Sequence, residues 1–271
     1  MASGTEETRR FYDDIGWKIQ GDKLVDVNLF GIREDGPIRM ELHKLLMDRV
    51  RSALGANVNL LECGCGANPA KWLLDKCSRY TGVDFSDTGL DVARTLFSDV
   101  TTPHEFRNAD VCNLPFEDGA FDAVYSAQMI FHIADPSSQD AALSQMARVV
   151  RRGGTIVLIA ANPYPLLFLG QLVRGIARDL PLVGAALNSV RKTPPLPYKP
   201  MPIGWMRTRL GKFGRVEVLT GALPTTYFNQ NVTEHRGISK LLWKGIRWLD
   251  INHPTISAYL GSYVMMVGKK T

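Results

Sequence analysis

The sequence lacks any long uninterrupted apolar segment. Its longest apolar run, from Ile156 to Leu169, is broken by the stretch "NPYP" and falls short of the ~18–20 apolar residues that a membrane-spanning helix requires. The first ten residues, "MASGTEETRR", are polar, and the apolar segment of a signal peptide does not follow them. We therefore expect a cytoplasmic protein without a signal peptide or a membrane span.

Cysteine and histidine are scarce, with four and five residues in the chain. No two cysteines form a CxxC pair and no histidine cluster accompanies them, so we expect reduced thiols and no bound metal. Cys63 and Cys65 flank Gly64 at a predicted turn. Small side chains fit such a turn, and we interpret both cysteines as buried residues rather than ligands.

Acidic residues are scarce in the C-terminal part of the chain. Residues 1–162 contain 17 Lys and Arg against 23 Asp and Glu, a net charge of −6, whereas residues 163–271 contain 15 against 4, a net charge of +11. Either a solvated basic face or a surface for an anionic partner, such as a phosphorylated substrate, a membrane or a nucleic acid, would explain this imbalance. Aromatic residues do not regularly interleave the basic ones, so we expect no nucleic-acid partner.

What the sequence does contain is an alternation of strand and helix patterns. Pro37, Gly55 and apolar residues at helical spacing predict a helix over 37–54, and a weaker amphipathic pattern predicts a short helix over 5–20. Further helices are predicted at 69–77, 87–97, 137–150 and 204–212, and strands at 58–63, 80–85, 105–110, 121–128, 155–161, 215–221 and 259–270. This order predicts βαβ units and a parallel sheet covered on both faces.

Two insertions interrupt the alternation. Residues 163–203 are rich in proline and apolar residues, and residues 222–257 include "ISKLLWKGIRWLD", a predicted amphipathic helix with a basic face. Both follow the carboxyl end of a predicted strand, the edge where α/β sheets bind ligands. We expect one domain with an N-terminal helical lid (1–55), a cofactor-binding core (56–162) and a substrate cap made by the insertions. Extra hydrophobic packing is the alternative role for them.

The stretch "NLLECGCGANP" combines an apolar strand pattern, an acid and two glycines. Gly64 and Gly66 fit the start of a dinucleotide-binding turn, but Pro69 stands where that turn needs a small residue. Asn68 and Pro69 suit the cap and first residue of a helix. Glu62 disfavours a pyrophosphate nearby and favours a ligand with a positively charged amino-acid end. The turn therefore suits a nucleoside better than two phosphates.

At this point the sequence resembles the class I S-adenosylmethionine-dependent methyltransferases. The resemblance spans about residues 55–162 and returns weakly in the last two strands. Its matching segments are "LLECGCG", "YTGVDFSDTGLDVAR", "FRNADVCNLPFEDGAFDAVYSAQMIFHIADP" and "MARVVRRGGTIVLIA". It implies a Rossmann-like three-layer α/β sandwich with helical insertions. The sheet would have seven mostly parallel strands, with the last one antiparallel. Asn68 departs from the family, because many relatives have a third glycine there.

The resemblance also implies S-adenosylmethionine as cofactor. Gly64 and Gly66 would let the backbone approach its methionine and ribose portion. Asp84 would accept both ribose hydroxyls, although an acid at a strand end can also cap a helix. The remaining contacts implied are Glu62 to the glycine turn or the ammonium group, Phe85 to the adenine face, Asp110 and Val111 to the adenine edge, and Gln128 to the methionine end.

Methyl transfer is an in-line displacement, for which the protein mainly positions the acceptor. His132, in "MIFHIADP", is our candidate general base, because neutral imidazole is basic enough at neutral pH; packing of the turn would explain it equally. The candidate acceptor-binding residues are Tyr12 and Trp17 in the N-terminal segment, and Tyr164, Tyr227 and His235 in the insertions. Core packing is the alternative for the N-terminal aromatics.

The predicted acceptor is a small molecule, because "SAQM" at the end of the fourth strand lacks the Asn/Asp-Pro-Pro-aromatic pattern of enzymes that methylate amino groups of nucleic acids. We expect O-methylation of an amphipathic or anionic metabolite, such as a natural product, a sugar or a lipid-linked compound. Peripheral contact with a membrane is compatible with the charge, as are a monomer and a homodimer. An RNA or protein methyltransferase, C- or N-methylation, an oxidoreductase and a non-catalytic binding protein remain alternatives.

Overall fold

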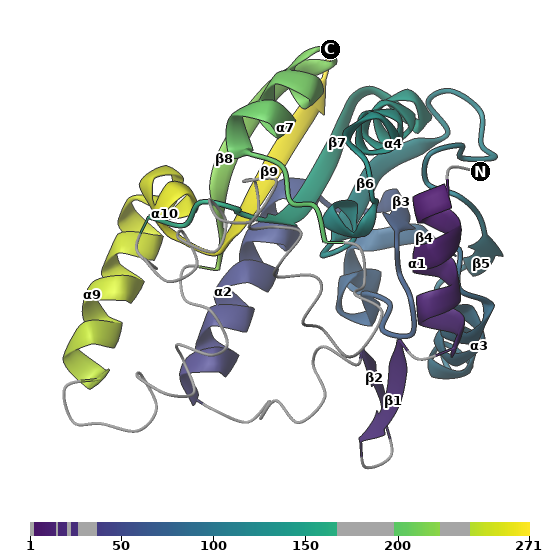
Figure 1. The fold of residues 1–271 in the computed structure, drawn as a ribbon, viewed down its shortest axis with the longest axis horizontal. Helices are drawn as coiled ribbons and strands as arrows, with labels where there is room; N and C mark the ends of the chain where they lie inside the picture. Colours follow the sequence, from purple (N-terminus) through teal and green to yellow (C-terminus); the bar gives the residue numbers. More distant parts are fainter. Residues whose placement is uncertain (1–2, 15, 21–22, 27–36, 167–197, 223–238) are drawn as a thin grey trace.

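The computed structural model describes residues 3–14, 16–20, 23–26, 37–166, 198–222 and 239–271 (Figure 1). A seven-stranded sheet with the order β5-β4-β3-β6-β7-β9-β8 forms its centre. The strands are β3 (Val58–Cys63), β4 (Cys77–Asp84), β5 (His104–Asn108), β6 (Phe121–Ala127), β7 (Val150–Ala161), β8 (Gly214–Ala222) and β9 (Tyr263–Lys270). Strand β9 runs antiparallel to both of its neighbours, β7 and β8, and the other neighbouring strands of this sheet pair in parallel. The predicted mostly parallel sheet with an antiparallel last strand is confirmed.

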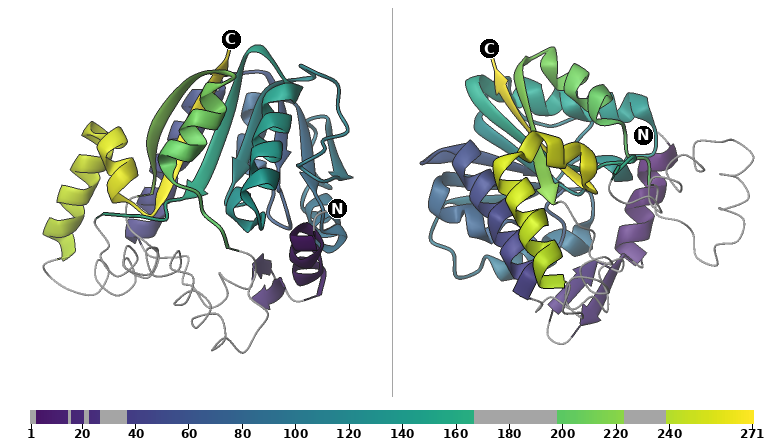
Figure 2. Two further views of the ribbon diagram at one scale, coloured as in Figure 1. Left: turned by 45° about the horizontal axis from the view of Figure 1, so that its top comes forward. Right: turned by 90° about the vertical axis from the view of Figure 1, so that its left-hand side faces the viewer.

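Helices cover both faces of this sheet, as Figure 2 shows. Successive strand residues point to opposite faces, so Val124 and Leu158 join one core cluster while their chain neighbours Tyr125 and Val157 join the other. The first cluster includes side chains of α4 (Pro136–Val149), α7 (Ile203–Gly211) and α10 (Pro254–Leu260), and the second those of α2 (Pro37–Leu54) and Phe97, which ends α3 (Asp87–Leu96). The predicted three-layer sandwich is therefore confirmed.

The N-terminal segment differs from the single helix predicted over 5–20. Helix α1 (Ser3–Asp14) ends earlier, and β1 (Trp17–Gln20) pairs antiparallel with β2 (Lys23–Asp26). The chain reverses at Gly16, whose N–H donates to the Phe11 carbonyl at 2.7 Å. A Cβ at Gly16 would lie 2.6 Å from Tyr12 Cα, so only glycine fits this turn.

The helix predicted over 69–77 is also shorter, and it is a 3₁₀ helix, η1 (Lys71–Lys76). Ala70 has φ −73° and ψ 60°, and the Lys71 N–H donates to the Pro69 carbonyl at 2.7 Å, an inverse γ-turn. The capping residue of η1 is Ala70, which makes no side-chain capping hydrogen bond. The predictions that Asn68 caps this helix and that Pro69 is its first residue are therefore wrong.

At the C-terminal end, the strand predicted over 259–270 begins later, because α10 extends to Leu260 and β9 starts at Tyr263. Pro254 occupies the first turn of α10, a position that favours helix over strand. The predicted amphipathic helix of the second insertion is present as α9 (Ser239–Asn252). Residues 167–197 and 223–238 of the predicted cap lie outside the described residues.

Candidate functional site

The glycine turn follows β3 at the carboxyl edge of the parallel strands. Gly64 and Gly66 have φ of +77° and +50°, in the left-handed region that favours glycine. The Gly64 and Cys65 N–H groups both donate to the Val83 carbonyl of β4, at 2.8 and 3.1 Å. A Cβ at Gly64 would lie 2.4 Å from Met129 Cγ. The turn therefore needs glycine both for its conformation and for the side chain that covers it.

Asp84, at the end of β4, is buried beside this turn. Its Oδ2 accepts the Gly66 N–H at 2.8 Å and its Oδ1 accepts the Ser86 N–H at 2.9 Å. Burial raises the pKa of Asp84 to about 6, although these backbone donors oppose the shift. The cap of α3 is Ser86, whose hydroxyl oxygen accepts the Gly89 N–H. Asp84 is therefore not the helix cap, which was its alternative role.

Glu62 anchors the far end of the turn. Its Oε2 accepts the Ala70 N–H at 2.8 Å and a short hydrogen bond from the Tyr80 hydroxyl. Burial raises the pKa of Glu62 to about 7, against the opposing effect of these hydrogen bonds. Of the two roles expected for Glu62, these contacts match orientation of the turn. The sequence analysis missed Tyr80, whose only local signal is a phenol within β4.

Helix α3 also approaches the turn closely. A Cβ at Gly89 would lie 3.1 Å from the Gly66 carbonyl carbon and 3.2 Å from the Ala67 nitrogen. The absent side chain at Gly89 lets the helix sit directly against the turn, much as the third glycine of a nucleotide-binding turn lets helix and strand approach each other. This residue was not predicted from the sequence.

Asp110 and Val111 begin the loop after β5. Asp110 Oδ1 accepts the Cys112 N–H at 2.8 Å, and its carbonyl accepts the Asn113 N–H at 2.9 Å. Asp110 is half-buried and Val111 is buried. This local turn fixes the carboxylate and the following backbone N–H at the sheet edge.

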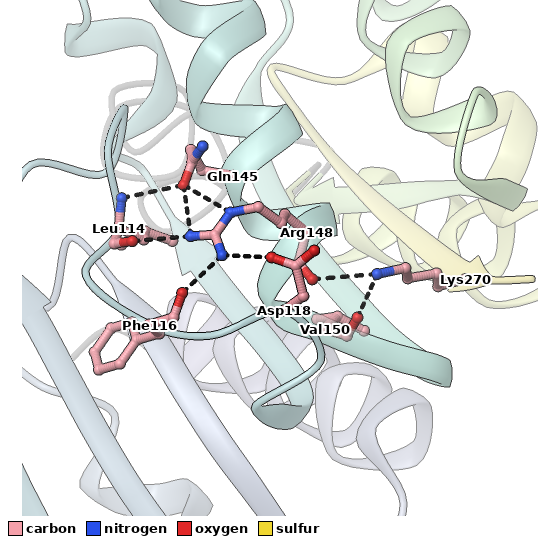
Figure 3. A network of polar contacts seen from close by, with 7 residues as sticks. All are labelled: Leu114, Phe116, Asp118, Gln145, Arg148, Val150 and Lys270. Atoms are coloured by element: carbon pink, nitrogen blue, oxygen red, sulfur yellow. Dashed lines mark hydrogen bonds and ion pairs between the residues drawn. The ribbon is translucent and has the colours of Figure 1, made fainter.

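Arg148 of α4 holds the rest of that loop (Figure 3). Its guanidinium donates to the carbonyls of Leu114 and Phe116, at 2.9 and 2.7 Å, and to the side chains of Asp118 and Gln145. All the donor nitrogens of the fork thus have acceptors. The loop that carries the predicted adenine contacts is therefore tied to a helix of the core.

Gln128 leaves β6 with φ +60°, a left-handed conformation that is uncommon for a residue other than glycine. Its N–H still donates to the Ile159 carbonyl of β7 at 3.0 Å, and its side chain is exposed. Strained backbone of this kind is frequent at functional sites. Here it redirects the chain so that Met129 covers Gly64.

His132 ends the 3₁₀ turn η2 (Ile130–His132) and joins a group of aromatic rings. Its imidazole centroid lies 6.3 Å from Tyr12 and 6.2 Å from Tyr198, and Tyr12 also lies 6.4 Å from Phe85. The Thr8 hydroxyl donates to the His132 carbonyl at 3.1 Å, which attaches α1 to this turn. The structure thus brings together predicted residues from three separate segments.

Tyr198 was missed by the sequence analysis. Its exposed ring lies 5.3 Å from Phe131, and the Lys199 N–H donates to the Phe131 carbonyl at 2.7 Å. Gln139 of α4 donates to the Lys199 carbonyl at 2.7 Å. The only sequence signal is an aromatic residue within "PPLPYKP".

The other predicted acceptor-binding residues are not part of this aromatic group as described. The Tyr164 N–H donates to Asn162 Oδ1 at 3.0 Å beyond the end of β7. Trp17 lies in β1, but its side chain is outside the described part of the structure, and Tyr227 and His235 lie outside the described residues altogether. Within the described ranges, no three His, Cys, Asp or Glu side chains gather as metal ligands would.

This arrangement matches a known family. Residues 61–158 match the family described as "Methyltransferase domain", and the fold is similar to those of solved methyltransferases, in alignments that cover 80% and 100% of this chain. The chain carries a class I S-adenosylmethionine-dependent methyltransferase domain. The methyltransferase domain thus spans β3 to β7, the part of the sheet that bears the glycine turn, Asp84 and His132.

Curated relatives of the methyltransferase domain include O-methyltransferase cnsE of Penicillium expansum, 28% identical over 50% of this chain and 52% of the relative. A ubiquinone biosynthesis O-methyltransferase of Alkalilimnicola ehrlichii is 30% identical over 48% of this chain and 53% of the relative. The chain thus spans about half the length of these curated relatives.

Among solved structures, geranyl diphosphate C-methyltransferase of Streptomyces coelicolor, in complex with Mg²⁺, geranyl diphosphate and S-adenosyl-L-homocysteine, is similar to the full chain. Its TM-score is 0.60 at 15% identity, and the alignment covers 100% of this chain and 99% of that one. At this identity the likeness concerns the fold alone. The N-terminal and C-terminal additions to the methyltransferase domain therefore have counterparts in a fold of the same extent.

Proposed function

We propose that this chain transfers a methyl group from S-adenosylmethionine to an oxygen of a small amphipathic acceptor. The observation that carries the proposal is the position of His132 directly beyond the glycine turn. The His132 N–H donates to the Met129 carbonyl at 2.8 Å, and the Met129 side chain covers Gly64. A base at this point would face an acceptor placed over the cofactor end of the turn.

The residues present fit this cofactor. Gly66 has no Cβ and a φ of +50°, so a ligand can approach its backbone closely. Each Asp84 oxygen accepts one backbone N–H, and an ionised carboxylate has about four acceptor positions, so capacity remains for ribose hydroxyls. Two buried carboxylates, Glu62 and Asp84, flank the turn, which disfavours the negative charge of a pyrophosphate. Asp110 supplies a further acceptor at the adenine edge.

When bound, S-adenosylmethionine would supply an activated methyl group on a sulfonium. In the overall reaction the S–CH₃ bond breaks, an O–CH₃ bond forms and the acceptor hydroxyl loses a proton. Neutral His132 would accept that proton as general base. Tyr12 and Tyr198, whose ring centroids lie 6.3 and 6.2 Å from that of the imidazole, would position a planar acceptor by edge or face contacts.

An oxygen acceptor is supported by two further facts. Relatives of the methyltransferase domain are named O-methyltransferases, and an aromatic group around a histidine suits a hydroxylated ring. Methylation of carbon also releases a proton, so the atom that carries the label in the product separates the two reactions. The N-terminal helix α1, attached through Thr8, would cover the acceptor as the predicted lid.

Transfer of labelled methyl to a panel of acceptors tests the proposal. We expect labelled methyl ethers from hydroxylated aromatic compounds that carry an apolar chain, and no labelled RNA or protein. His132→Ala should lower kcat by about 10²–10⁴-fold and leave the affinity for S-adenosylhomocysteine unchanged. His104→Ala, which removes a ring that contacts the Thr102 carbonyl away from the site, is the control. Unchanged kcat in His132→Ala, or methylation of carbon, would contradict the proposal.

A further inference from the structure

Helix α9 has an inner face that is fixed to α2. Trp243 Nε1 donates to Glu41 at 3.0 Å, and Arg49 forms a 2.7 Å ion pair with Asp250. Trp243 and Ile246 are buried against Leu42. These contacts, from two ends of the sequence, hold α9 in one orientation and determine which of its side chains point outward.

The outer face of α9 is apolar. Leu241, Trp248 and Ile251 are 75%, 58% and 42% exposed, and their spacing of seven and three residues places them on one side of a helix. Lys244, three residues after Leu241, is exposed on the same side. Single exposed apolar residues are common, but a row of large ones along one helix marks an interaction surface.

Helix α10 continues this surface. Ile256 and Tyr259 are 54% and 40% exposed, and the Trp248 ring lies 5.1 Å from His253 at the junction of the two helices. In the right-hand view of Figure 2, α9 and α10 lie side by side nearest the viewer. We call Leu241, Trp248, Ile251, Ile256 and Tyr259 the outer α9–α10 surface.

The outer surface lies at the edge of the sheet that carries the candidate site. The Leu166 N–H, just beyond the carboxyl end of β7, donates to the Tyr259 carbonyl at 3.3 Å, and Leu166 is itself 59% exposed. Asn162 binds the Gly261 carbonyl at 2.8 Å, which fixes α10 to this edge. An acceptor molecule released from a partner bound to this surface would therefore already be at the edge of the sheet where His132 lies.

The charge of α9 indicates the kind of partner. Its sequence contains Lys240, Lys244 and Arg247 against a single acid, Asp250. The Asp250 side chain is 1% exposed and paired with Arg49. Of the charged side chains that α9 is described as exposing, Arg247 pairs with Glu41 of α2, and Lys244 leaves a positive charge beside the apolar row. A second copy would bury this charge, whereas the cores of protein interfaces are depleted of charge.

We infer that the outer α9–α10 surface binds a bilayer that contains anionic lipid. A row of exposed aliphatic residues that includes Trp248 and Tyr259, with Lys244 on the same side of α9, matches the boundary between acyl chains and headgroups. No helix within the described ranges is long and apolar enough to cross a membrane, so the contact is peripheral. The inference rests on the proposed function in one respect: an amphipathic acceptor would be present in the bilayer that this surface binds.

Sedimentation of the full chain with phosphatidylcholine vesicles, with and without phosphatidylglycerol, tests the inference. We expect binding to the anionic vesicles only. Ile251→Ser and Trp248→Ser should weaken it about tenfold or more, and Lys244→Glu by about fivefold or more. Leu96→Ser, which alters an apolar residue of similar exposure (45%) on α3, and Lys212→Glu on α7 are the matched controls.

Absence of binding to anionic vesicles, equal binding to neutral ones, or equal losses in the control variants would overturn the inference. So would a dimer, detected by analytical ultracentrifugation, that Ile251→Ser dissociates, because the surface would then be occupied by a second copy. Thermal unfolding of each variant confirms that it is folded. Binding of S-adenosylhomocysteine is measured separately, so failure of the membrane contact and failure of the proposed function are distinguishable.

Discussion

The backbone N–H of Gly66 donates to the carboxylate of Asp84 at 2.8 Å. This bond joins the turn after β3 to the end of β4, and Gly89 lets α3 approach the same turn. Three elements therefore meet at one backbone segment, with a buried acid at their centre. Hydrogen bonds within the protein thus hold the turn in one conformation, which lowers the entropic cost of binding a ligand.

Replacement of Asp84 tests its role in cofactor binding. Asp84→Asn replaces one acceptor oxygen by a donor that faces a backbone N–H, and it removes the charge. We expect the affinity for S-adenosylhomocysteine, measured by calorimetry, to fall by about 1.5–3 kcal/mol. Asp91→Asn on the outside of α3, where the acid is 76% exposed, should leave it unchanged. Unchanged affinity in Asp84→Asn would remove this residue from the cofactor site.

A comparison of two glycines separates the cost of backbone strain from the cost of steric overlap with a neighbouring side chain. Gly55 and Gly64 have similar φ of +86° and +77°, but a Cβ at Gly55 would meet nothing within 4 Å, whereas one at Gly64 would lie 2.4 Å from Met129 Cγ. Gly55→Ala should lower the free energy of unfolding by about 1–2 kcal/mol. Gly64→Ala should cost about 1–3 kcal/mol more, measured by denaturant unfolding. Equal losses would show that Met129 does not restrict the turn.

The buried acid Glu62 predicts an unusual pH dependence of stability. Burial raises its pKa from 4.5 to about 7, so between these values the folded state binds more protons than the unfolded state. The contribution of Glu62 to stability is therefore fully present at low pH and falls as pH rises from about 4.5 to 7. Burial shifts the pKa of Asp84 in the same direction.

Glu62→Gln isolates this contribution. Both hydrogen bonds reach one oxygen, Oε2, which the glutamine carbonyl can replace. Relative to wild type, the variant should gain stability between pH 5 and 8, by an amount on the order of 3 kcal/mol at most. Glu117→Gln, at an exposed position, should follow the wild-type curve. Parallel curves for Glu62→Gln and wild type would contradict a raised pKa.

The hydrogen bonds of Arg148 predict a link between the stability of the core and the loop after β5, residues 110–118. Arg148→Lys keeps the charge but cannot donate to Leu114, Phe116 and Asp118 together. We expect a loss of about 2–3 kcal/mol in the free energy of unfolding and faster amide exchange over residues 110–118. Arg94→Lys, at an exposed ion pair with Asp91, is the control. If amide exchange over residues 110–118 stays at the wild-type rates in Arg148→Lys, the loop keeps its structure without the guanidinium.

The sheet and the strand-end residues could be predicted because their signals are local. Apolar runs such as "VNLLEC" and the glycines after them occur within one short segment, and β3 has the predicted bounds. The helix after the turn could not be predicted correctly. Its start depends on the Glu62 carboxylate binding the Ala70 N–H, a contact that helix-start signals at Asn68 and Pro69 do not contain.

The acceptor side was predicted less completely, because its contacts join distant segments. Tyr198 lies near His132 where the Lys199 N–H donates to the Phe131 carbonyl, and no residue pattern near position 198 indicates this contact. Tyr12 was predicted from the N-terminal segment, but its position between Phe85 and His132 depends on the docking of α1. The predictions for Trp17, Tyr227 and His235 stay predictions.

Calorimetry of the wild-type chain with S-adenosylhomocysteine and with NAD tests the central claim most directly. That claim is a nucleoside site shaped by Glu62, the glycine turn and Asp84. We predict saturable binding of S-adenosylhomocysteine with one site per chain, and no heat of binding with NAD. Binding of NAD, or heat from neither compound, would contradict the account.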